Sequence, residues 1–102
     1  DKFKTLNILI QAYKPESLLI FCNTKVQVIE LTDLLYQRGH SAIDIHGDLD
    51  QRERNEAVLV FSNGSKRILV ATDVASRGLD IKDIELVINY DLPFDQEVYT
   101  HR

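Results

Sequence analysis

The segment from Arg67 to Ile81 constrains the fold more than any other part of this chain. It begins with four consecutive apolar residues, 68–71, which are rich in strand-forming types and too few for a helix. Such a run is typical of a strand buried on both faces of a parallel sheet. The polar residues Thr72 and Asp73 follow at once, at the carboxyl end of that strand, where open α/β sheets bind ligands. The segment therefore predicts an α/β fold with a binding site at this strand end.

Helical and strand patterns alternate along the rest of the chain. Apolar spacing and capping residues predict helices over 2–13, 25–37 and 51–61, and a short helical stretch from residue 94 or 95 to the end. The predicted strands cover residues 18–22, 42–46, 68–71 and 86–90. This alternation implies right-handed crossovers. We therefore expect one domain over residues 1–102, with a mostly parallel sheet between two layers of helices (α/β/α).

Polar residues follow each of the four predicted strands. They form four clusters, at 23–24, 46–48, 72–73 and 89–91. The carboxyl ends of parallel strands meet at one edge of a sheet, so we expect all four clusters to lie along that edge.

Composition limits the partners of the chain. The 102 residues carry a formal net charge of -4, which argues against a broad basic surface for nucleic acid, so a few placed groups would have to hold RNA or DNA. No apolar run approaches the roughly 18 residues of a spanning helix, and we expect no membrane partner. The single cysteine, Cys22, lies in an apolar run and excludes an internal disulfide. These features predict a cytoplasmic protein.

Several common catalytic designs are missing from the sequence. It contains neither G-x-x-x-x-G-K-[ST] nor G-x-G-x-x-G, so the chain alone lacks both standard phosphate cradles. It has no G-x-S-x-G nucleophile turn. Its histidines, His40, His46 and His101, show no metal-ligand spacing, and we expect no metal site. What remains suits recognition of phosphate and sugar.

The candidate binding residues combine backbone freedom with hydroxyl, amide and charged groups near the predicted strand ends. They are Thr24, Gly47, Gln51, Arg54, Thr72, Arg77, Gly78 and Asp80. Glycines let a backbone approach a ligand closely, and a helix start offers free amides and a positive dipole end to a phosphate. Each position also has a plainer explanation: a solvated helix face for 51–54, a helix cap for Asp80, and a solvated loop for Arg77.

Five ordered segments resemble the second RecA-like domain of DEAD-box RNA helicases. They are L-I-F-C-N-T (19–24), H-G-D-L-D-Q-R-E-R (46–54), I-L-V-A-T-D-V-A-S-R-G-L-D-I (68–81), V-I-N-Y-D-L-P (87–93) and H-R (101–102). The resemblance covers essentially the whole chain, and A-T-D-x-x-x-R-G-L-D is its most specific part. The run 46–81 also resembles the bacterial DbpA-type ribosome-assembly subgroup.

The resemblance implies a RecA-like (P-loop NTPase-like) fold and a role for each matching residue. Thr24, Gly47, Gln51, Arg54 and Thr72 would hold the backbone of one RNA strand. Asp80 and Gly78 would contact ATP, Asp80 through the ribose, and Arg77 would couple the ATP and RNA sites across the interface with a first RecA-like domain. His101 and Arg102 match the start of H-R-I-G-R-x-x-R, so we expect the chain to stop inside the last helicase motif, before its arginine fingers.

The sequence therefore predicts the C-terminal domain of an ATP-dependent RNA helicase, which binds the RNA backbone and completes an ATP site to unwind short duplexes. ATP would be the cofactor, with Mg²⁺ held mainly by the first domain, and the subgroup implies ribosomal RNA and ribosome biogenesis. We expect the chain alone to be inactive. The alternatives are an isolated, weak RNA-backbone binding module and the corresponding domain of a DNA-acting superfamily 2 helicase. A flavodoxin-like small-molecule domain would need a cofactor motif that the sequence lacks.

Overall fold

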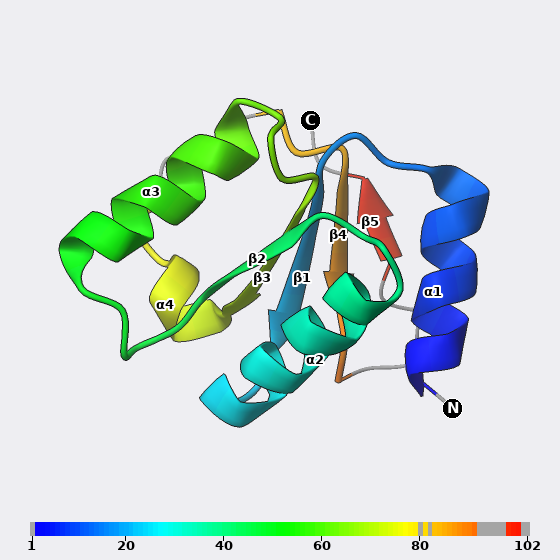
Figure 1. Cartoon of the computed structure of the whole chain (residues 1–102), viewed down its shortest axis with the longest axis horizontal. Helices are drawn as coiled ribbons and strands as arrows, with labels where there is room; N and C mark the ends of the chain where they lie inside the picture. The colour runs from blue at the N-terminus through cyan, green and yellow to red at the C-terminus, as the bar shows by residue number, and fades with distance from the viewer. Residues whose placement is uncertain (1, 80, 82, 92–97, 101–102) are drawn as a thin grey trace.

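A computed structural model of the chain describes residues 2–79, 81, 83–91 and 98–100 (Figure 1). The helices are α1 (Lys2–Tyr13), α2 (Lys25–Gln37), α3 (Gln51–Ser62) and α4 (Asp73–Ser76). The strands are β1 (Leu18–Cys22), β2 (Ala42–Ile45), β3 (Ile68–Thr72), β4 (Leu86–Asn89) and β5 (Val98–Thr100).

The strands form one mostly parallel sheet in the order β2-β3-β1-β4-β5. Neighbouring strands from β2 to β4 run parallel, and β5 pairs antiparallel with β4. In the register, Leu19 of β1 lies between Leu69 of β3 and Val87 of β4. The apolar run 68–71 occupies an interior strand, as its composition predicts.

The helices cover both faces of the sheet and enclose two apolar cores (Figure 1). On one face, α1 and α2 contribute Leu6 and Leu31, which pack with Ile20 of β1. On the other face, α3 and α4 contribute Phe61 and Ala75. These pack with the residues of β3 and β1 that alternate with those in the first core. Because successive side chains of a strand point to opposite faces of the sheet, the same strands contribute to both cores. The three-layer α/β/α prediction is confirmed.

Local capping sets the starts of the long helices at the carboxyl edge of the sheet. Asp50 caps α3: its carboxylate accepts a hydrogen bond from the backbone of Glu53 at 2.8 Å, and the Glu53 side chain accepts one from the Asp50 backbone at 3.0 Å. Thr24 and Gln27 form the same box at the start of α2. Capping boxes satisfy backbone donors that have no partner within the helix.

The structure corrects the prediction at several element ends. Strand β3 continues to Thr72, and α4 follows directly because the Thr72 hydroxyl caps the next turn, accepting from the Ala75 backbone at 3.2 Å. Strands β2 and β4 each end one residue earlier than predicted.

The helical prediction is wrong for residues 98–100. They form β5, where Thr100 lies opposite Leu86 and Val98 opposite Ile88. Two β-branched residues and a tyrosine favour a strand, and pairing with β4 satisfies backbone groups that a three-residue helix would leave without partners. The other residues of the predicted helical stretch lie outside the described part of the chain. Within that part, no helix combines the length and apolarity needed to cross a membrane.

Candidate functional site

The polar clusters gather at the carboxyl edge of the sheet, which we define by the segments 23–24, 46–50, 72–79 and 89–91. Hydrogen bonds and an ion pair link these segments and the helices that follow them. The Asn23 backbone N donates to Asp91 Oδ2 at 2.6 Å, and Lys25 Nζ lies 2.6 Å from Asp48 Oδ2. An arginine of α3 also donates to a carbonyl of α4. The expectation that the strand ends share one edge is confirmed by the parallel pairing.

Asp91 holds the end of β1 in place from the end of β4. Besides the Asn23 backbone, its carboxylate accepts a hydrogen bond from Gln27 Nε2 at 3.0 Å. Gln27 in turn contacts Thr24, whose Oγ1 accepts from the Gln27 backbone at 3.2 Å. Thr24 itself is exposed. Asp91 therefore sets the position of a candidate RNA-binding hydroxyl, a role that sequence reasoning missed because the partners lie 64 and 68 residues away.

The turn after β2 presents Gly47 to solvent. His46 is buried beside it, and its Nδ1 accepts a hydrogen bond from the Asp48 backbone at 3.3 Å, which identifies His46 as a structural residue. The hydrogen bond and charge of Lys25 lower the pKa of the Asp48 carboxyl. A Cβ added at Gly47 would meet no atom within 4 Å, so the surface is open there.

The segment after β3 carries the residues assigned to ATP and to coupling. Arg77 pairs with Asp73, with 3.1 Å between Nη2 and Oδ2, and both side chains are more than 70% exposed. Such an exposed pair contributes less than about 1 kcal/mol, so a phosphate could replace Asp73 as the partner of Arg77. Gly78 has a φ of +79°, a left-handed conformation that favours glycine. Asp80 lies outside the described residues, as do His101 and Arg102.

The two residues of the Q-x-x-R element behave differently. Gln51 is exposed, and its amide donates to Asn55 Oδ1 at 2.9 Å. Arg54 is half-buried: its Nη2 donates to the Ala75 carbonyl at 2.7 Å, and its Nε is buried with no hydrogen-bond partner in the described part of the chain. Gln51 is available to a ligand, whereas Arg54 joins α3 to α4.

A groove of about 410 Å³ brings Gln51 and Gly78 together. It runs between α3 and the segment after α4. Its lining combines an apolar floor with amide and hydroxyl groups, from Gln51, Asn55, Val58, Leu59, Ser62, Gly78 and Leu79. The groove therefore connects a residue assigned to RNA with one assigned to ATP.

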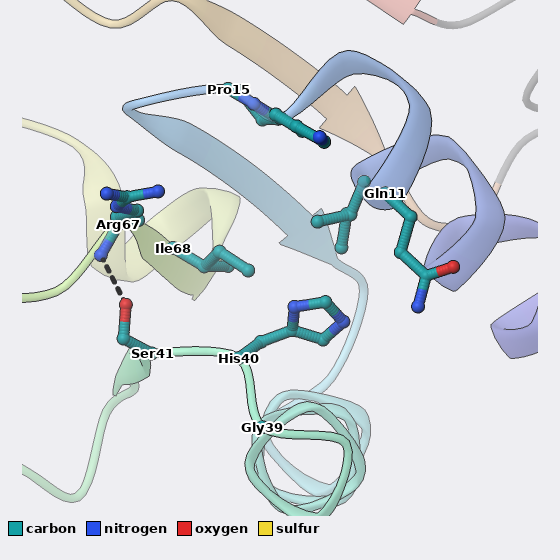
Figure 2. A pocket seen from close by; sticks show the side chains of 9 residues that line it. Gln11, Pro15, Gly39, His40, Ser41, Arg67 and Ile68 are labelled. Atoms are coloured by element: carbon teal, nitrogen blue, oxygen red, sulfur yellow. Dashed lines mark hydrogen bonds between the residues drawn. The ribbon is translucent and has the colours of Figure 1, made fainter.

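A second pocket, of about 430 Å³, lies at the opposite, amino edge of the sheet (Figure 2). Its lining comes from the ends of α1 and α2 and the starts of β2 and β3: Ile10, Gln11, Lys14, Pro15, Gly39, His40, Ser41, Arg67 and Ile68. The Arg67 backbone donates to Ser41 Oγ at 3.1 Å across it. None of the predicted site residues lines this pocket, and no sequence motif marks it. Among the described residues, no three His, Cys, Asp or Glu side chains form a group that could hold a metal ion.

Comparisons with known proteins agree with this arrangement. The family model of the helicase conserved C-terminal domain matches residues 1–102. The ATP-dependent RNA helicase DbpA of Escherichia coli (strain K12) is 50% identical over 101 residues, which are 99% of this chain and 22% of that protein. The C-terminal domain of the DEAD-box protein Dbp5 has a TM-score of 0.82 at 38% identity, covering 91% of this chain and 52% of that one.

This chain is a C-terminal RecA-like domain of the DEAD-box RNA helicase family. The resemblance in the motifs and the expected fold are thereby confirmed. The E. coli DEAD-box protein SrmB, solved bound to regulator of ribonuclease activity A (RraA), has a TM-score of 0.84 at 35% identity, covering 90% of this chain and 54% of that one. The chain spans about a fifth of the length of the curated helicase DbpA. The roles of the individual site residues in this DEAD-box domain stay predictions.

Proposed function

We propose that this domain belongs to an ATP-dependent RNA helicase, in which it holds the backbone of one RNA strand and completes an ATP site. The observation that carries the proposal is the carboxyl edge itself: exposed hydroxyl, amide and glycine positions stand beside an exposed, weakly paired arginine. The partner that completes the site would be a first RecA-like domain. The parent would then be an ATP-hydrolysing enzyme that separates short RNA duplexes.

On the RNA side, the binding groups are neutral donors rather than a basic surface. Capping holds the hydroxyls of Thr24 and Thr72 in place. The Thr72 hydroxyl could donate its proton to a phosphate, and the Thr24 hydroxyl could do so by giving up its long 3.3 Å bond to Gln27 Oε1. Gly47 leaves the backbone open, and Gln51 presents an exposed amide at the start of α3. Donors of this kind suit a chain with a net charge of -4, and they hold a backbone without reading its bases.

On the ATP side, one described residue, Arg77, has the charge and exposure to bind a phosphate-bearing ligand. The Arg77 side chain is 73% exposed and, among the described residues, is held only by its exposed pair with Asp73, so it can turn toward a phosphate without a large cost. Gly78 gives the backbone beside it a conformation that other residues rarely adopt. Asp80 would contact the ribose, and Mg²⁺ would be held mainly by the first domain. When bound, ATP would supply, through its hydrolysis, the free energy for closure and release of the two RecA-like domains.

The decisive test joins this chain, extended through the H-R-I-G-R-x-x-R motif, to a DEAD-box first domain. ATP hydrolysis is measured with and without RNA for the parent and for Arg77→Ala and Asp80→Ala. We expect RNA-stimulated turnover in the parent and its loss in both variants, while circular dichroism shows that they stay folded. Turnover that ignores both residues would overturn the assignment. The chain alone should hydrolyse ATP no faster than a blank.

A weak RNA-backbone binding module is a second candidate for the chain in isolation. The exposed hydroxyl and amide groups at the carboxyl edge favour it, because they need no second domain to reach a phosphate. Titration with single-stranded RNA at low and high salt should show binding that weakens as salt rises. A DNA strand of the same sequence serves as the comparison, and equal binding of the two would favour a DNA-acting superfamily 2 helicase.

The 50% identity to E. coli DbpA supports a DbpA-type parent. On that basis we propose ribosomal RNA as the substrate, ribosome biogenesis as the process and the cytoplasm as the location. Unwinding of ribosomal RNA fragments, compared with unrelated RNA of equal length and stability, tests the substrate. Equal rates on both would contradict the DbpA-type assignment.

A further inference from the structure

We propose that Arg54 is a positioning residue, which holds the segment 73–79 in place through the Ala75 carbonyl instead of gripping an RNA phosphate. This inference deepens the proposed function and rests on it for its consequence in catalysis. Its structural part, the tie between α3 and α4, stands on the geometry alone.

The Arg54 side chain is turned into the protein. Its Nη2 donates to the Ala75 carbonyl at 2.7 Å, a short distance for a charged donor. Its Nε is buried, and no described residue is its hydrogen-bond partner. A guanidinium in this position must break a good hydrogen bond before it can turn to a phosphate in solvent. The Gln51 amide, one turn earlier in α3, is exposed and bonds only to the neighbouring exposed Asn55 among the described residues, so water or a phosphate can replace that partner.

The segment 73–79 needs an anchor. Helix α4 has four residues, so its internal hydrogen bonds are few, and the last carbonyls of a helix have no partner within it. Other hydrogen bonds of the segment, such as that from Arg77 N to the Val74 carbonyl at 3.3 Å, are local. Apart from the cap by Thr72, which directly precedes the segment in the chain, the bond from Arg54 is, among the described residues, the hydrogen bond that joins 73–79 to another element. Apolar packing of Ala75 against Phe61 completes the contact.

The consequence is a physical connection between the two halves of the proposed site. Gln51, assigned to RNA, stands three residues before Arg54, and Arg77, assigned to coupling, stands two residues after Ala75. The groove that Gln51 and Gly78 share lies beside the same tie. Loss of Arg54 would therefore loosen Arg77 and Gly78 relative to the RNA-binding helix without removing a phosphate contact.

Amide hydrogen exchange tests the structural part on this chain, without RNA or ATP. Arg54→Ala should speed exchange at Ala75, Arg77 and Leu79 by about tenfold, because the bond lost involves a charged donor. Arg52→Ala is the matched control: it removes the same charge from the same helix, and within the described residues Arg52 pairs with the exposed Glu56 alone. Exchange in 73–79 that is equal in both variants would overturn the proposal.

A second variant covers the case in which Arg54→Ala does not fold. Arg54→Met keeps the apolar stem and removes the donors, and it should speed exchange in 73–79 in the same way. Unchanged exchange in a folded Arg54→Met would equally overturn the tie.

RNA binding and turnover separate positioning from phosphate contact. In the two-domain protein, if Arg54 contacts an RNA phosphate, Arg54→Met should make the fall of log K for RNA binding with log salt less steep, by about 0.7 in slope. Positioning predicts an unchanged slope and a fall of at least about tenfold in kcat at saturating RNA. A lowered slope with unchanged kcat would overturn the proposal. If the parent shows no RNA-stimulated turnover, the proposed function fails, whereas the exchange comparison still decides the role of Arg54.

Discussion

Replacing Asp91 with alanine removes the contact that fixes the end of β1 against the end of β4. The carboxylate accepts hydrogen bonds from the Asn23 backbone at 2.6 Å and from Gln27 Nε2 at 3.0 Å. Hydrogen bonds to a charged group contribute roughly 1.5–3 kcal/mol each. The Asn23 segment is exposed, so water can satisfy the freed donors, and we take about 1 kcal/mol for each bond. The expected loss of unfolding free energy is about 2 kcal/mol, or about 30-fold in the unfolding equilibrium.

Urea unfolding, followed by circular dichroism, measures this loss. With an unchanged slope, the midpoint should fall by about 1 M. Asp33→Ala is the control, because Asp33 accepts one hydrogen bond from Gln37 on the exposed face of α2, and its replacement should stay within about 0.5 kcal/mol of the parent. Asp91→Asn keeps one carbonyl acceptor and should lose about half as much.

The same variant has a local signature. Exchange of the Asn23 and Gln27 backbone amides should accelerate in Asp91→Ala, because the loop that carries Thr24 loses its anchor. If Asp91→Ala unfolds at the same urea concentration as Asp33→Ala, and the Asn23 amide exchanges as in the parent, the hydrogen bonds to Asp91 contribute nothing and the reasoning is refuted.

Three further predictions concern the Cys22 thiol and two glycines. Burial, with the nearby Asp91 carboxylate, raises the pKa of Cys22 from 9.0 to about 12. Because the thiolate is the form that reacts, iodoacetamide at pH 8 should modify the folded chain about 1000-fold more slowly than the urea-unfolded chain. Equal rates would contradict this prediction. Because the folded pKa is the higher one, this thiol should cost stability as pH rises from about 9 toward 12, by about 1.4 kcal/mol per pH unit in urea titrations. Gly78→Ala should lower the unfolding free energy by about 1 kcal/mol, because φ is +79°, whereas Gly47→Ala should change it by less than about 0.5 kcal/mol; equal thermal shifts would refute the distinction.

Much of the fold follows from local pattern. Three helices and the positions of four strands agree with the sequence to within a residue or two, because near-continuous apolar runs and capping boxes encode them over short stretches. The strand at 98–100 was not predicted from the sequence, because a three-residue strand carries little periodicity and depends on pairing with β4. Helix α4 escaped prediction for a similar reason: one threonine cap starts a turn too short to show a period.

In the candidate site, too, the residues placed by local pattern were predictable, and those placed by contacts with distant segments were not. Parallel pairing placed Thr24, Gly47 and Thr72 at one edge, as the strand-end argument predicts. The inward direction of Arg54 and the anchoring role of Asp91 were not visible, because their partners lie 21 and 64–68 residues away in the chain.

The sequence by itself determined the α/β class, the three long helices, the four parallel strands and the DEAD-box family, since these depend on local spacing and on motifs that keep their order. The tertiary structure alone decided which side chains of the carboxyl edge face a ligand and which bind the protein. It also formed the pocket at the amino edge, where residues from three separate segments meet. The physical reason is that a hydrogen bond between distant segments depends on the packing of both, and no local pattern records it.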